Sequence, residues 1–384
     1  MQNIHSKQYK IGILGGGQLG RMTLQEAYNL NLHISVLDPA EGAPSEALAH
    51  EFVKGDFKDF ETVYNFGKNK EIITIEFEDV NVEALEKLEN EGVKVFPQSR
   101  VLRIIQDKGL QKQFYRLNKF PTANYILIDS AKEAQAANVR FPVFQKLRRS
   151  GYDGYGVQSI DNQYELKNAF DAPSILEEKV DLKKELSVIV ARNESGECKT
   201  FPMVELEFNP KANMVEFLFS PAIVDKSIET EAYRLAKALI QGLDMVGILA
   251  VEFFLSKKGE LMINEIAPRS HNSGHHSIEA NYISQFGQHI RAILNLPLGK
   301  TDMRCPAVMI NLLGEEGHQG TAQYEGLEEA LNIEGVYPHL YGKEEVKSFR
   351  KMGHITILNE NLEAAKAIAH QLKKMVKVTA IQKK

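Results

Sequence analysis

A strand, a glycine-rich turn, a helix and a second strand follow one another near the start of the chain, and this order restricts the fold more than any other feature. The apolar run Lys10–Leu14 leads into Gly15–Gly20, an amphipathic segment at about Arg21–Leu30 and the strand-like run His33–Asp38. This is a βαβ unit, whose two strands run parallel because a helix crosses between them. Similar patterns continue to about Val101, which predicts an open parallel sheet with helices on both faces.

Two regions that mix helices and strands follow the parallel sheet. We expect one helix over Leu102–Leu117, and then a small unit in which the strands Pro142–Leu147 and Val157–Ile160 flank a glycine-rich loop. In the third region we expect a helix over Ser277–Leu294 and a closing helix over Leu362–Val376. The prediction is an α/β and α+β chain with a Rossmann-like domain at residues 1–108, a small lid domain at 109–184 and a C-terminal domain at 185–384.

Composition narrows the possible partners. The chain has 384 residues, of which 43% are hydrophobic and 25% are charged, and its net charge is −5. Because charges of both signs are interspersed, we expect neither nucleic acid nor an anionic membrane as a partner. Two distant cysteines, Cys198 and Cys305, favour a cytoplasmic location over a disulfide framework. No apolar run approaches the about 18 residues of a membrane span, and we see no signal core.

Two apolar strands late in the chain each carry one acid. Glu252 lies within Ile248–Leu255, and Glu265 lies in the strand that begins at Leu261. The Lys257–Gly259 turn between them indicates a hairpin, on which the two carboxylates would face one another. Hard oxygen ligands without thiolates suit Mg²⁺, which usually completes its shell with substrate phosphates. Either acid could instead simply face solvent.

The loop after the second acid strand concentrates polar groups. Arg269, His271, Asn272 and Ser273 follow Glu265 within a few residues. An acid, a guanidinium, an imidazole and small polar side chains after a buried strand are typical of a site for an anionic substrate. A zinc site that uses His271, His275 and His276 is an alternative, although no cysteine lies near to complete it.

Two glycine-rich segments could each approach phosphates. Gly15-x-Gly17-x-x-Gly20, with Asp38 at the end of the next strand, is the dinucleotide fingerprint, but the turn could hold another phosphate or serve packing only. The loop Gly151–Gly156 lies between two strands and follows Lys146, which suits a mobile lid over phosphates or an exposed hairpin. Acids near Glu177–Val180 could bind adenine and ribose or be surface charge.

Together these motifs resemble the ATP-grasp superfamily, and within it the 5-(carboxyamino)imidazole ribonucleotide synthase family of purine biosynthesis. The segments that carry the resemblance are Gly15-Gly-Gly-Gln-Leu-Gly-Arg-Met22, Thr74-Ile-Glu-Phe-Glu-Asp-Val80, Gln106-Asp-Lys108, Gly151-Tyr-Asp-Gly154, Asn264-Glu-Ile-Ala-Pro-Arg269, His271-Asn-Ser-Gly-His275, Val308-Met-Ile-Asn-Leu-Leu-Gly314 and Tyr341-Gly-Lys343. The resemblance implies an ATP-grasp fold with an N-terminal Rossmann-like domain. It also implies an enzyme that makes carboxyphosphate from ATP and bicarbonate and then carboxylates aminoimidazole ribonucleotide.

The resemblance also implies roles for individual residues. ATP would contact Lys108, Lys146, Gly151, Tyr152, Asp153, Gly154, Gly156, Glu177, Glu178, Lys179, Val180, Glu185, Asn264 and Glu265. Mg²⁺, or in its place Mn²⁺, would be bound by Glu252 and Glu265. Bicarbonate and the aminoimidazole would contact Glu76, Tyr152, Asp153, Arg269, His271, Asn272 and Ser273, and the ribotide phosphate would contact Gln18, Leu19, Lys343 and Arg350. Asp153, Arg269 and His271 would be catalytic, with Asp153 taking the proton of the amine and His271 exchanging a proton near neutral pH.

Several positions depart from the family pattern, namely Tyr155, Val157, Glu205, His276 and Lys347. They concern the lid and the adenine rim rather than the reaction. Three other functions stay open at this point: a formate-using ribotide transformylase, an NAD-dependent oxidoreductase and a non-catalytic binding module. The resemblance further implies a homodimer whose product passes to the mutase that follows in the pathway.

Overall fold

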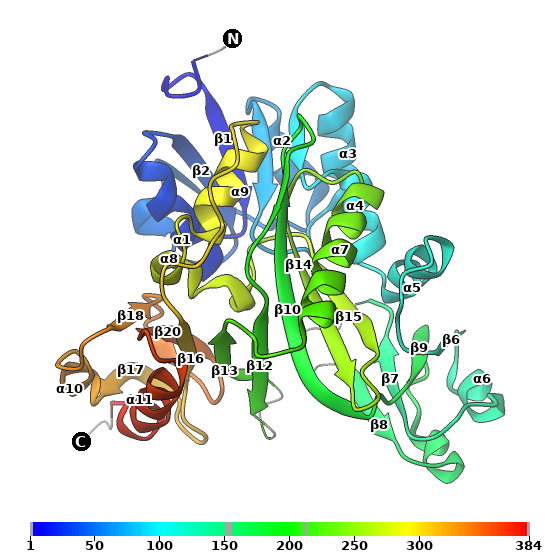
Figure 1. Cartoon of the computed structure of the whole chain (residues 1–384). Helices are drawn as coiled ribbons and strands as arrows, with labels where there is room; N and C mark the ends of the chain where they lie inside the picture. Colours follow the sequence, from blue (N-terminus) through cyan, green and yellow to red (C-terminus); the bar gives the residue numbers. More distant parts are fainter. Residues whose placement is uncertain (1–2, 150–155, 210, 212–213, 382–384) are drawn as a thin grey trace.

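The computed structural model of the protein describes residues 3–149, 156–209, 211 and 214–381. Figure 1 shows the N-terminal sheet with its helices at one end of the molecule, and a long central sheet beside it. At the other end lie a small unit, at residues 125–178, and the C-terminal segment, at residues 307–380, which supplies three strands of the central sheet. In the described part of the chain no helix is long and apolar enough to cross a membrane.

The N-terminal unit is a five-stranded parallel sheet in the order β3-β2-β1-β4-β5. Its elements are β1 (Lys10–Leu14), α1 (Gln18–Tyr28), β2 (His33–Asp38), η1 (Glu46–Leu48), β3 (Glu51–Lys54), α2 (Phe60–Gly67), β4 (Ile72–Ile75), α3 (Val82–Asn90) and β5 (Lys94–Phe96). Ile13 packs with Leu24 of α1, whereas Leu14 packs with Val63 of α2 and Leu85 of α3. Helices therefore cover both faces, and the predicted parallel sheet is confirmed.

The small unit is a four-stranded antiparallel sheet in the order β6-β9-β7-β8. Its elements are β6 (Tyr125–Ile128), α6 (Ala131–Ala136), β7 (Val143–Leu147), β8 (Val157–Ile160), η2 (Gln163–Asn168) and β9 (Ser174–Glu178). Lys146 pairs with Val157, so the glycine-rich loop joins neighbouring antiparallel strands as predicted. Residues 150–155 of that loop lie outside the described part.

The central sheet is antiparallel and runs in the order β15-β14-β10-β12-β13-β16-β20-β18, with β11 paired to β10. Its strands are β10 (Leu182–Arg192), β11 (Cys198–Thr200), β12 (Val204–Asn209), β13 (Met214–Ser220), β14 (Gly247–Ser256), β15 (Leu261–Ala267), β16 (Ala307–Leu313), β18 (Val336–Leu340) and β20 (Lys351–Leu358). Helix α7 (Lys226–Gly242) covers one face, where Leu186 and Phe253 join Leu239 in the core. Because strand side chains alternate, Ser187 and its register partner Glu252 face the opposite side, where the polar site lies.

The C-terminal unit packs onto the far strands of the central sheet. Its remaining elements are β17 (Gly320–Glu325), α10 (Leu327–Ala330), β19 (Glu345–Val346), α11 (Leu362–Met375) and β21 (Lys377–Ala380), with β17, β19 and β21 in a second small sheet. Ala365 and Leu372 of α11 are fully buried with Ile310 and Ile357. The closing helix was predicted, but most of these strands were not.

The single helix expected over Leu102–Leu117 is wrong. The chain forms α4 (Ser99–Ile105) and α5 (Lys108–Leu117), separated at Asp107. The Asp107 carboxylate accepts a hydrogen bond from the Gly109 N–H at 2.8 Å and thereby caps a new helix.

The helix expected over Ser277–Leu294 is also wrong as one element. It consists of α8 (Ser277–Ala280) and α9 (Gln285–Ile293), and the 3₁₀ turn η3 (Asn272–Gly274) precedes them. Ser284 caps α9 because its hydroxyl accepts a hydrogen bond from the Gly287 N–H at 2.9 Å.

Candidate active site

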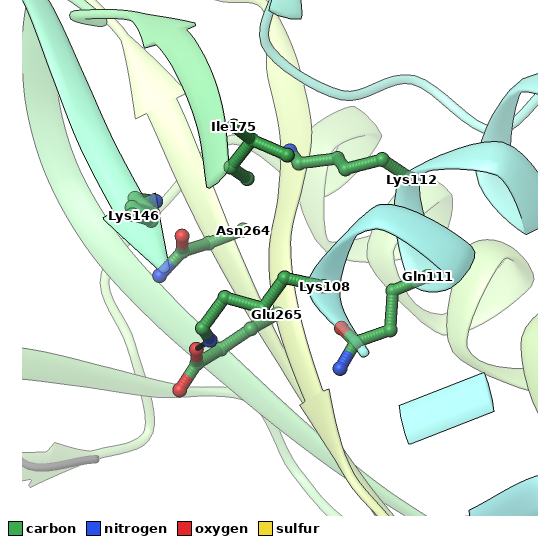
Figure 2. Close-up of a pocket in the computed structure, with 7 residues that line it drawn as sticks. All are labelled: Lys108, Gln111, Lys112, Lys146, Ile175, Asn264 and Glu265. Carbon is green, nitrogen blue, oxygen red and sulfur yellow. Dashed lines mark hydrogen bonds and ion pairs between the residues drawn. The ribbon is translucent and has the colours of Figure 1, made fainter. Parts of the chain in front are cut away.

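A pocket opens where α5, the small antiparallel sheet and β15 meet (Figure 2). Its lining combines ammonium, amide, carboxylate and aliphatic groups: Lys108, Gln111 and Lys112 from α5, Lys146 from β7, Ile175 from β9, and Asn264 and Glu265 from β15. In Figure 2 the Lys108 side chain reaches the Glu265 carboxylate, and Asn264 lies beside them. Several cations around a carboxylate suit a polyphosphate that binds together with a metal ion.

The N-terminus of α5 is fixed to the end of β7. Asp107 accepts hydrogen bonds from Nε and Nη2 of Arg148 at 2.9 and 2.8 Å, in addition to capping the helix. The Lys108 N–H donates to the Arg148 carbonyl at 2.9 Å. These contacts hold Lys108 and Lys146, the two lysines assigned to ATP phosphates by the resemblance, in a fixed relation to each other.

Glu252 and Glu265 lie on the neighbouring strands β14 and β15, whose register is irregular between Val251 and Phe253. The Lys108 ammonium is 2.9 Å from Glu265 and lowers the pKa of that carboxyl, whose side chain is 48% exposed. Burial and then the charge of Glu265 raise the pKa of Glu252. A divalent cation would relieve the repulsion within this pair of oxygen donors, so the residues present fit Mg²⁺.

Glu177 has partners other than those that the resemblance implies. Its carboxylate is buried on β9 between two ammonium groups, Lys146 at 2.5 Å and Lys112. Burial raises the pKa of Glu177, but the two lysines more than offset this effect, so the pKa is lowered. A contact of Glu177 with adenine or ribose stays a prediction.

Arg269 and His271 lie on the loop that leaves β15. The Arg269 guanidinium binds the Glu78 carboxylate through Nε and, at 3.1 Å, through Nη2. The Nδ1 atom of His271 is 2.9 Å from the Ser273 hydroxyl, and its Nε2 is 3.7 Å from Glu252. Burial and then the charge of Arg269 lower the pKa of His271 to about 4. With this pKa the ring is neutral near pH 7, which does not favour the proton exchange that we expected from it.

The other histidines of this loop have separate surroundings. The ring centre of His275 lies 4.8 Å from that of His354, and its Nδ1 accepts a hydrogen bond from the Gln285 amide N–H at 3.1 Å. His276 is buried, and neither of its ring nitrogens has a polar partner among the described residues. Among the residues that the structure describes, no three His, Cys, Asp or Glu side chains are grouped to hold a metal. The zinc alternative is therefore not supported.

The N-terminal glycine turn surrounds a carboxylate of the protein itself. Glu76 accepts a hydrogen bond from the Leu19 N–H at 3.1 Å, and a Cβ at Gly17 would lie only 2.3 Å from Glu76 Oε1. Burial raises the pKa of Glu76 to about 7, in spite of the N–H groups directed at it. Asp38, the expected ribose ligand of a dinucleotide site, instead accepts a hydrogen bond from the Gly16 N–H at 2.6 Å.

The C-terminal unit, which carries the expected phosphate ligands Lys343 and Arg350, contacts the helix that follows this turn. Tyr341 packs with Leu19 and Met22 of α1 in one buried cluster. The neighbouring Lys343 donates to the Lys351 carbonyl at 2.8 Å, and Arg350 donates to the Glu345 carbonyl at 2.6 Å. Asn272 is held by a reciprocal pair of amide hydrogen bonds with Asn311 of β16, at 2.8 and 3.0 Å.

The remaining predicted residues divide into two groups. Gly151, Tyr152, Asp153 and Gly154 lie outside the described residues, as does the departure Tyr155. Gly156 adopts a left-handed φ of 73°, Glu178 binds Asn124 at 3.0 Å, and Lys179 lies 5.6 Å from the Phe144 ring centre. Burial raises the pKa of Glu185 to about 7.

Sequence reasoning missed Lys112 and Glu78. Lys112 lies four residues after Lys108, on the same face of α5. That spacing could have identified it as a second lysine at the pocket. Glu78 lies two residues after Glu76, in a segment that contributed to the resemblance, but nothing local indicates its pairing with Arg269.

Three family models match the chain in succession. They are the ribonucleotide synthetase preATP-grasp domain at residues 8–106, the ATP-grasp domain at residues 113–286 and the phosphoribosylaminoimidazole carboxylase C-terminal domain at residues 307–368. The fold and the pocket thus define an ATP-grasp enzyme with a parallel-sheet N-terminal domain, an ATP-dependent ligase by class. More narrowly, the chain belongs to the N5-carboxyaminoimidazole ribonucleotide synthase family.

Similar proteins span this family. The synthase of Bacillus subtilis is 39% identical over 91% of this chain and 91% of its own length. The chloroplastic phosphoribosylaminoimidazole carboxylase of Vigna aconitifolia is 39% identical over 92% of this chain, which spans 65% of that longer protein. The synthetase structure from Thermotoga maritima is 43% identical, with a TM-score of 0.89 over 97% of this chain and 100% of that one. A synthase structure from Aspergillus clavatus, a complex with ADP and 5-aminoimidazole ribonucleotide, is 32% identical, with a TM-score of 0.88 over 96% and 98%.

Proposed function

We propose that the protein carboxylates 5-aminoimidazole ribonucleotide on its exocyclic amine, using ATP and bicarbonate, in de novo purine biosynthesis. The products are N5-carboxyaminoimidazole ribonucleotide, ADP and phosphate. The observation that carries the proposal is the convergence of Lys108, Lys146 and Glu265 in one pocket, next to the Arg269–Ser273 loop. A family member that binds ADP and the ribotide supports the same pair of substrates.

ATP would bind with its phosphates against Lys108 and Lys146. Each ammonium group also contacts a carboxylate, Lys108 that of Glu265 and Lys146 that of Glu177, and these contacts hold the two lysines where the polyphosphate would bind. The chain between Glu177 and Glu185 would hold adenine and ribose, with Glu178, Lys179 and Val180 at the rim. Gly151, Tyr152, Gly154 and Gly156 would cover the phosphates.

Glu252 and Glu265, with Asn264 beside them, would hold Mg²⁺ or Mn²⁺. The metal ion, when bound, neutralises charge on the transferred phosphoryl group and aligns the phosphates. Lys108 is the counter-ion of Glu265 in the structure. Lys108 would therefore exchange a carboxylate partner for a phosphate when ATP and metal arrive together.

Bicarbonate would be phosphorylated beside Arg269 and His271. An oxygen of bicarbonate attacks the γ-phosphorus, ADP leaves, and carboxyphosphate forms. The carboxyl carbon of bicarbonate is a poor electrophile, and in carboxyphosphate it carries phosphate as a good leaving group. Arg269 can pair with this anion in fork geometry while Glu78 fixes the guanidinium. The lowered pKa of His271 keeps its ring neutral, so we assign it hydrogen bonding to bicarbonate rather than proton transfer.

The ribotide would lie between the glycine turn and the C-terminal unit. Its phosphate would contact Lys343, Arg350 and the Gln18 and Leu19 amides, and Glu76, Asn272 and Ser273 would contact the rest of the molecule. Asp153 would take the proton that the amine loses as it attacks the carboxyl carbon. This placement requires the Leu19 N–H to be shared with, or released from, Glu76.

We also propose the larger-scale assignments as part of this function. Residues 1–108 would supply the ribotide turn, 109–184 the lid, and 185–384 the metal carboxylates. A homodimer in the cytoplasm, with its product passed to the mutase, completes the proposal.

Turnover with single substrates omitted tests the proposed function. Rapid ADP release should require bicarbonate and ATP, and the ribotide should be needed for the carboxylated product. Substitution of formate for bicarbonate should give no ribotide-dependent turnover. A preference for formate would identify a transformylase, and enhanced NADH fluorescence without ATP turnover would identify a dinucleotide site.

A further inference from the structure

A buried ion pair joins α5 to β9 at the wall of the pocket, and one of its members, Lys112, has no role in the proposed chemistry. Lys112 of α5 binds Glu177 of β9, and their side chains are only 4% and 2% exposed. Burying two charges costs free energy unless the ion pair is well aligned and its remaining hydrogen-bonding groups have partners. Removing one partner of such a pair usually destabilises the fold strongly. A buried charge at Lys112 therefore needs a structural or functional explanation.

The carboxylate of this pair also fixes a pocket lysine. Glu177 Oε1 is 2.5 Å from Lys146 Nζ, while the Lys112 ammonium binds the other carboxylate oxygen. If Lys146 alone were paired with Glu177, the two charges would cancel and a phosphate would gain little from Lys146. With Lys112 present, the group has two positive charges and one negative charge, so one positive charge remains available next to the phosphates.

Lys112 also touches the connection between α5 and the small sheet. Its ammonium donates to the Thr122 hydroxyl, which in turn donates to the Ile263 carbonyl at 2.9 Å. The Ile263 N–H donates to the Pro121 carbonyl at 2.8 Å. Ile263 precedes Glu265 by two residues on β15, so Lys112 connects the strand of Lys146, the linker and the strand of the metal carboxylate.

We propose that Lys112 is a positioning residue for ATP: through Glu177 it holds Lys146 at the phosphates, and its charge keeps the Lys112–Glu177–Lys146 group positive. This inference rests on the proposed ATP site, but it concerns nucleotide binding rather than the identity of the carboxyl acceptor. Lys112 itself does not touch the reacting atoms. Figure 2 shows it reaching the pocket from α5, next to Ile175 and away from Glu265.

Charge and packing make different predictions for three variants. Lys112→Met removes the charge at nearly constant volume and leaves Lys146 neutralised by Glu177, so the KM for ATP should rise by about tenfold or more. Lys112→Arg should retain most of the wild-type affinity. The double variant Lys112→Met/Glu177→Gln restores one net positive charge, so its KM for ATP should be at least about threefold lower than that of Lys112→Met, although the proposed contact of Glu177 with the nucleotide is lost as well.

Calorimetric titration with Mg·ADP measures binding without turnover, and thermal unfolding of each variant checks that it is folded. Lys132→Met, an exposed lysine on α6 of the same unit, is the matched control and should bind as wild type does. The KM for the ribotide should change by less than about twofold in every folded variant.

The inference is overturned if folded Lys112→Met binds Mg·ADP and ATP as wild type does. It is also overturned if the double variant is as impaired in nucleotide binding as Lys112→Met, because the pair would then act only through packing. Failure of the proposed function would look different: the wild type would bind Mg·ADP normally but show no turnover that depends on bicarbonate and the ribotide.

Discussion

At the residue scale, the site is organised by ion pairs between its own charged side chains. Lys108 neutralises Glu265, Arg269 neutralises Glu78, and Glu252 is left as the carboxyl with the raised pKa. A buried carboxylate without a cationic partner is costly to ionise, so the pKa of Glu252 is raised, whereas Glu265 is paired and about half exposed. In the proposed function, a metal ion bound with ATP would replace Lys108 as the partner of Glu265.

Glu265→Gln tests this arrangement. The change removes one anionic metal ligand and also leaves Lys108 without its carboxylate, so ADP release at saturating Mg²⁺ should fall by at least about 100-fold. The melting temperature should stay close to that of wild type because the side chain is 48% exposed. Glu207→Gln, at an exposed position of β12, is the control and should keep full activity. If Glu265→Gln kept most of the wild-type turnover, Glu265 would not belong to the proposed metal site.

Glu76 predicts a pH dependence of stability. Burial raises its pKa from 4.5 to about 7, so the folded protein holds this proton more tightly than the unfolded chain does. Stability should therefore decrease as pH rises through that interval, by an amount on the order of 3 kcal/mol at most for this group. In Glu76→Gln this contribution should disappear.

Urea unfolding of both proteins at pH 5 and pH 8 measures the effect. The advantage of wild type over Glu76→Gln should be larger at pH 5 than at pH 8, and contributions of other carboxyls cancel in the comparison. Parallel stability profiles would show that the carboxyl of Glu76 does not titrate with a raised pKa.

The two carboxylates that are proposed to bind the metal could be singled out from a local sequence pattern. Glu252 and Glu265 stand out because each is an acid within an apolar strand of one hairpin. Lys112 and Glu177 could not be paired in this way, because their burial depends on packing between α5 and β9. The neutral state of His271 likewise follows from burial and from Arg269, which a sequence alone does not reveal.

At the element scale, the turn between β1 and α1 needs glycine for close approach. A Cβ at Gly17 would meet Glu76 Oε1 at 2.3 Å, whereas one at Gly242, at the end of α7, would meet Phe114 Cζ at an ordinary 3.5 Å. Gly17→Ala should therefore destabilise the fold by about 1–3 kcal/mol, while Gly242→Ala should be neutral or slightly stabilising.

Denaturant unfolding and steady-state kinetics test the two alanine variants together. Gly17→Ala should also raise the KM for the ribotide and leave the KM for ATP nearly unchanged, because the turn belongs to the proposed ribotide site. A selective loss of ATP affinity would instead assign the turn to the nucleotide. Equal stability of the two variants would contradict the close contact with Glu76.

Helix existence was easier to predict than helix boundaries. The helical character of residues 102–117 was apparent, but Asp107 divides the segment, because the same carboxylate caps α5 and binds Arg148 forty-one residues further along. Such a cap depends on a distant partner. Ser284 divides the later segment by a local cap, so that division could have been recognised from the sequence.

At the scale of the whole molecule, the site forms where separate units meet. The parallel sheet was predictable because strand, turn and helix follow in a regular order, and the hairpin of β14 and β15 was predictable from its turn. The extension of the central sheet through β16, β20 and β18 was not, because long-range antiparallel pairing leaves little local signal. The proposed ribotide site depends on this extension, since it brings Tyr341, two residues before Lys343, against α1.

The transfer of oxygen from bicarbonate tests the central claim most directly. With ¹⁸O-labelled bicarbonate, ATP and the ribotide, mass spectrometry of the released phosphate should show one labelled oxygen for each ADP formed, because carboxyphosphate passes its bridging oxygen to phosphate. The carboxylated ribotide should appear in equal amount. Unlabelled phosphate, released at the same rate and dependent on the ribotide, would show that ATP phosphorylates something other than bicarbonate and would contradict the proposed reaction.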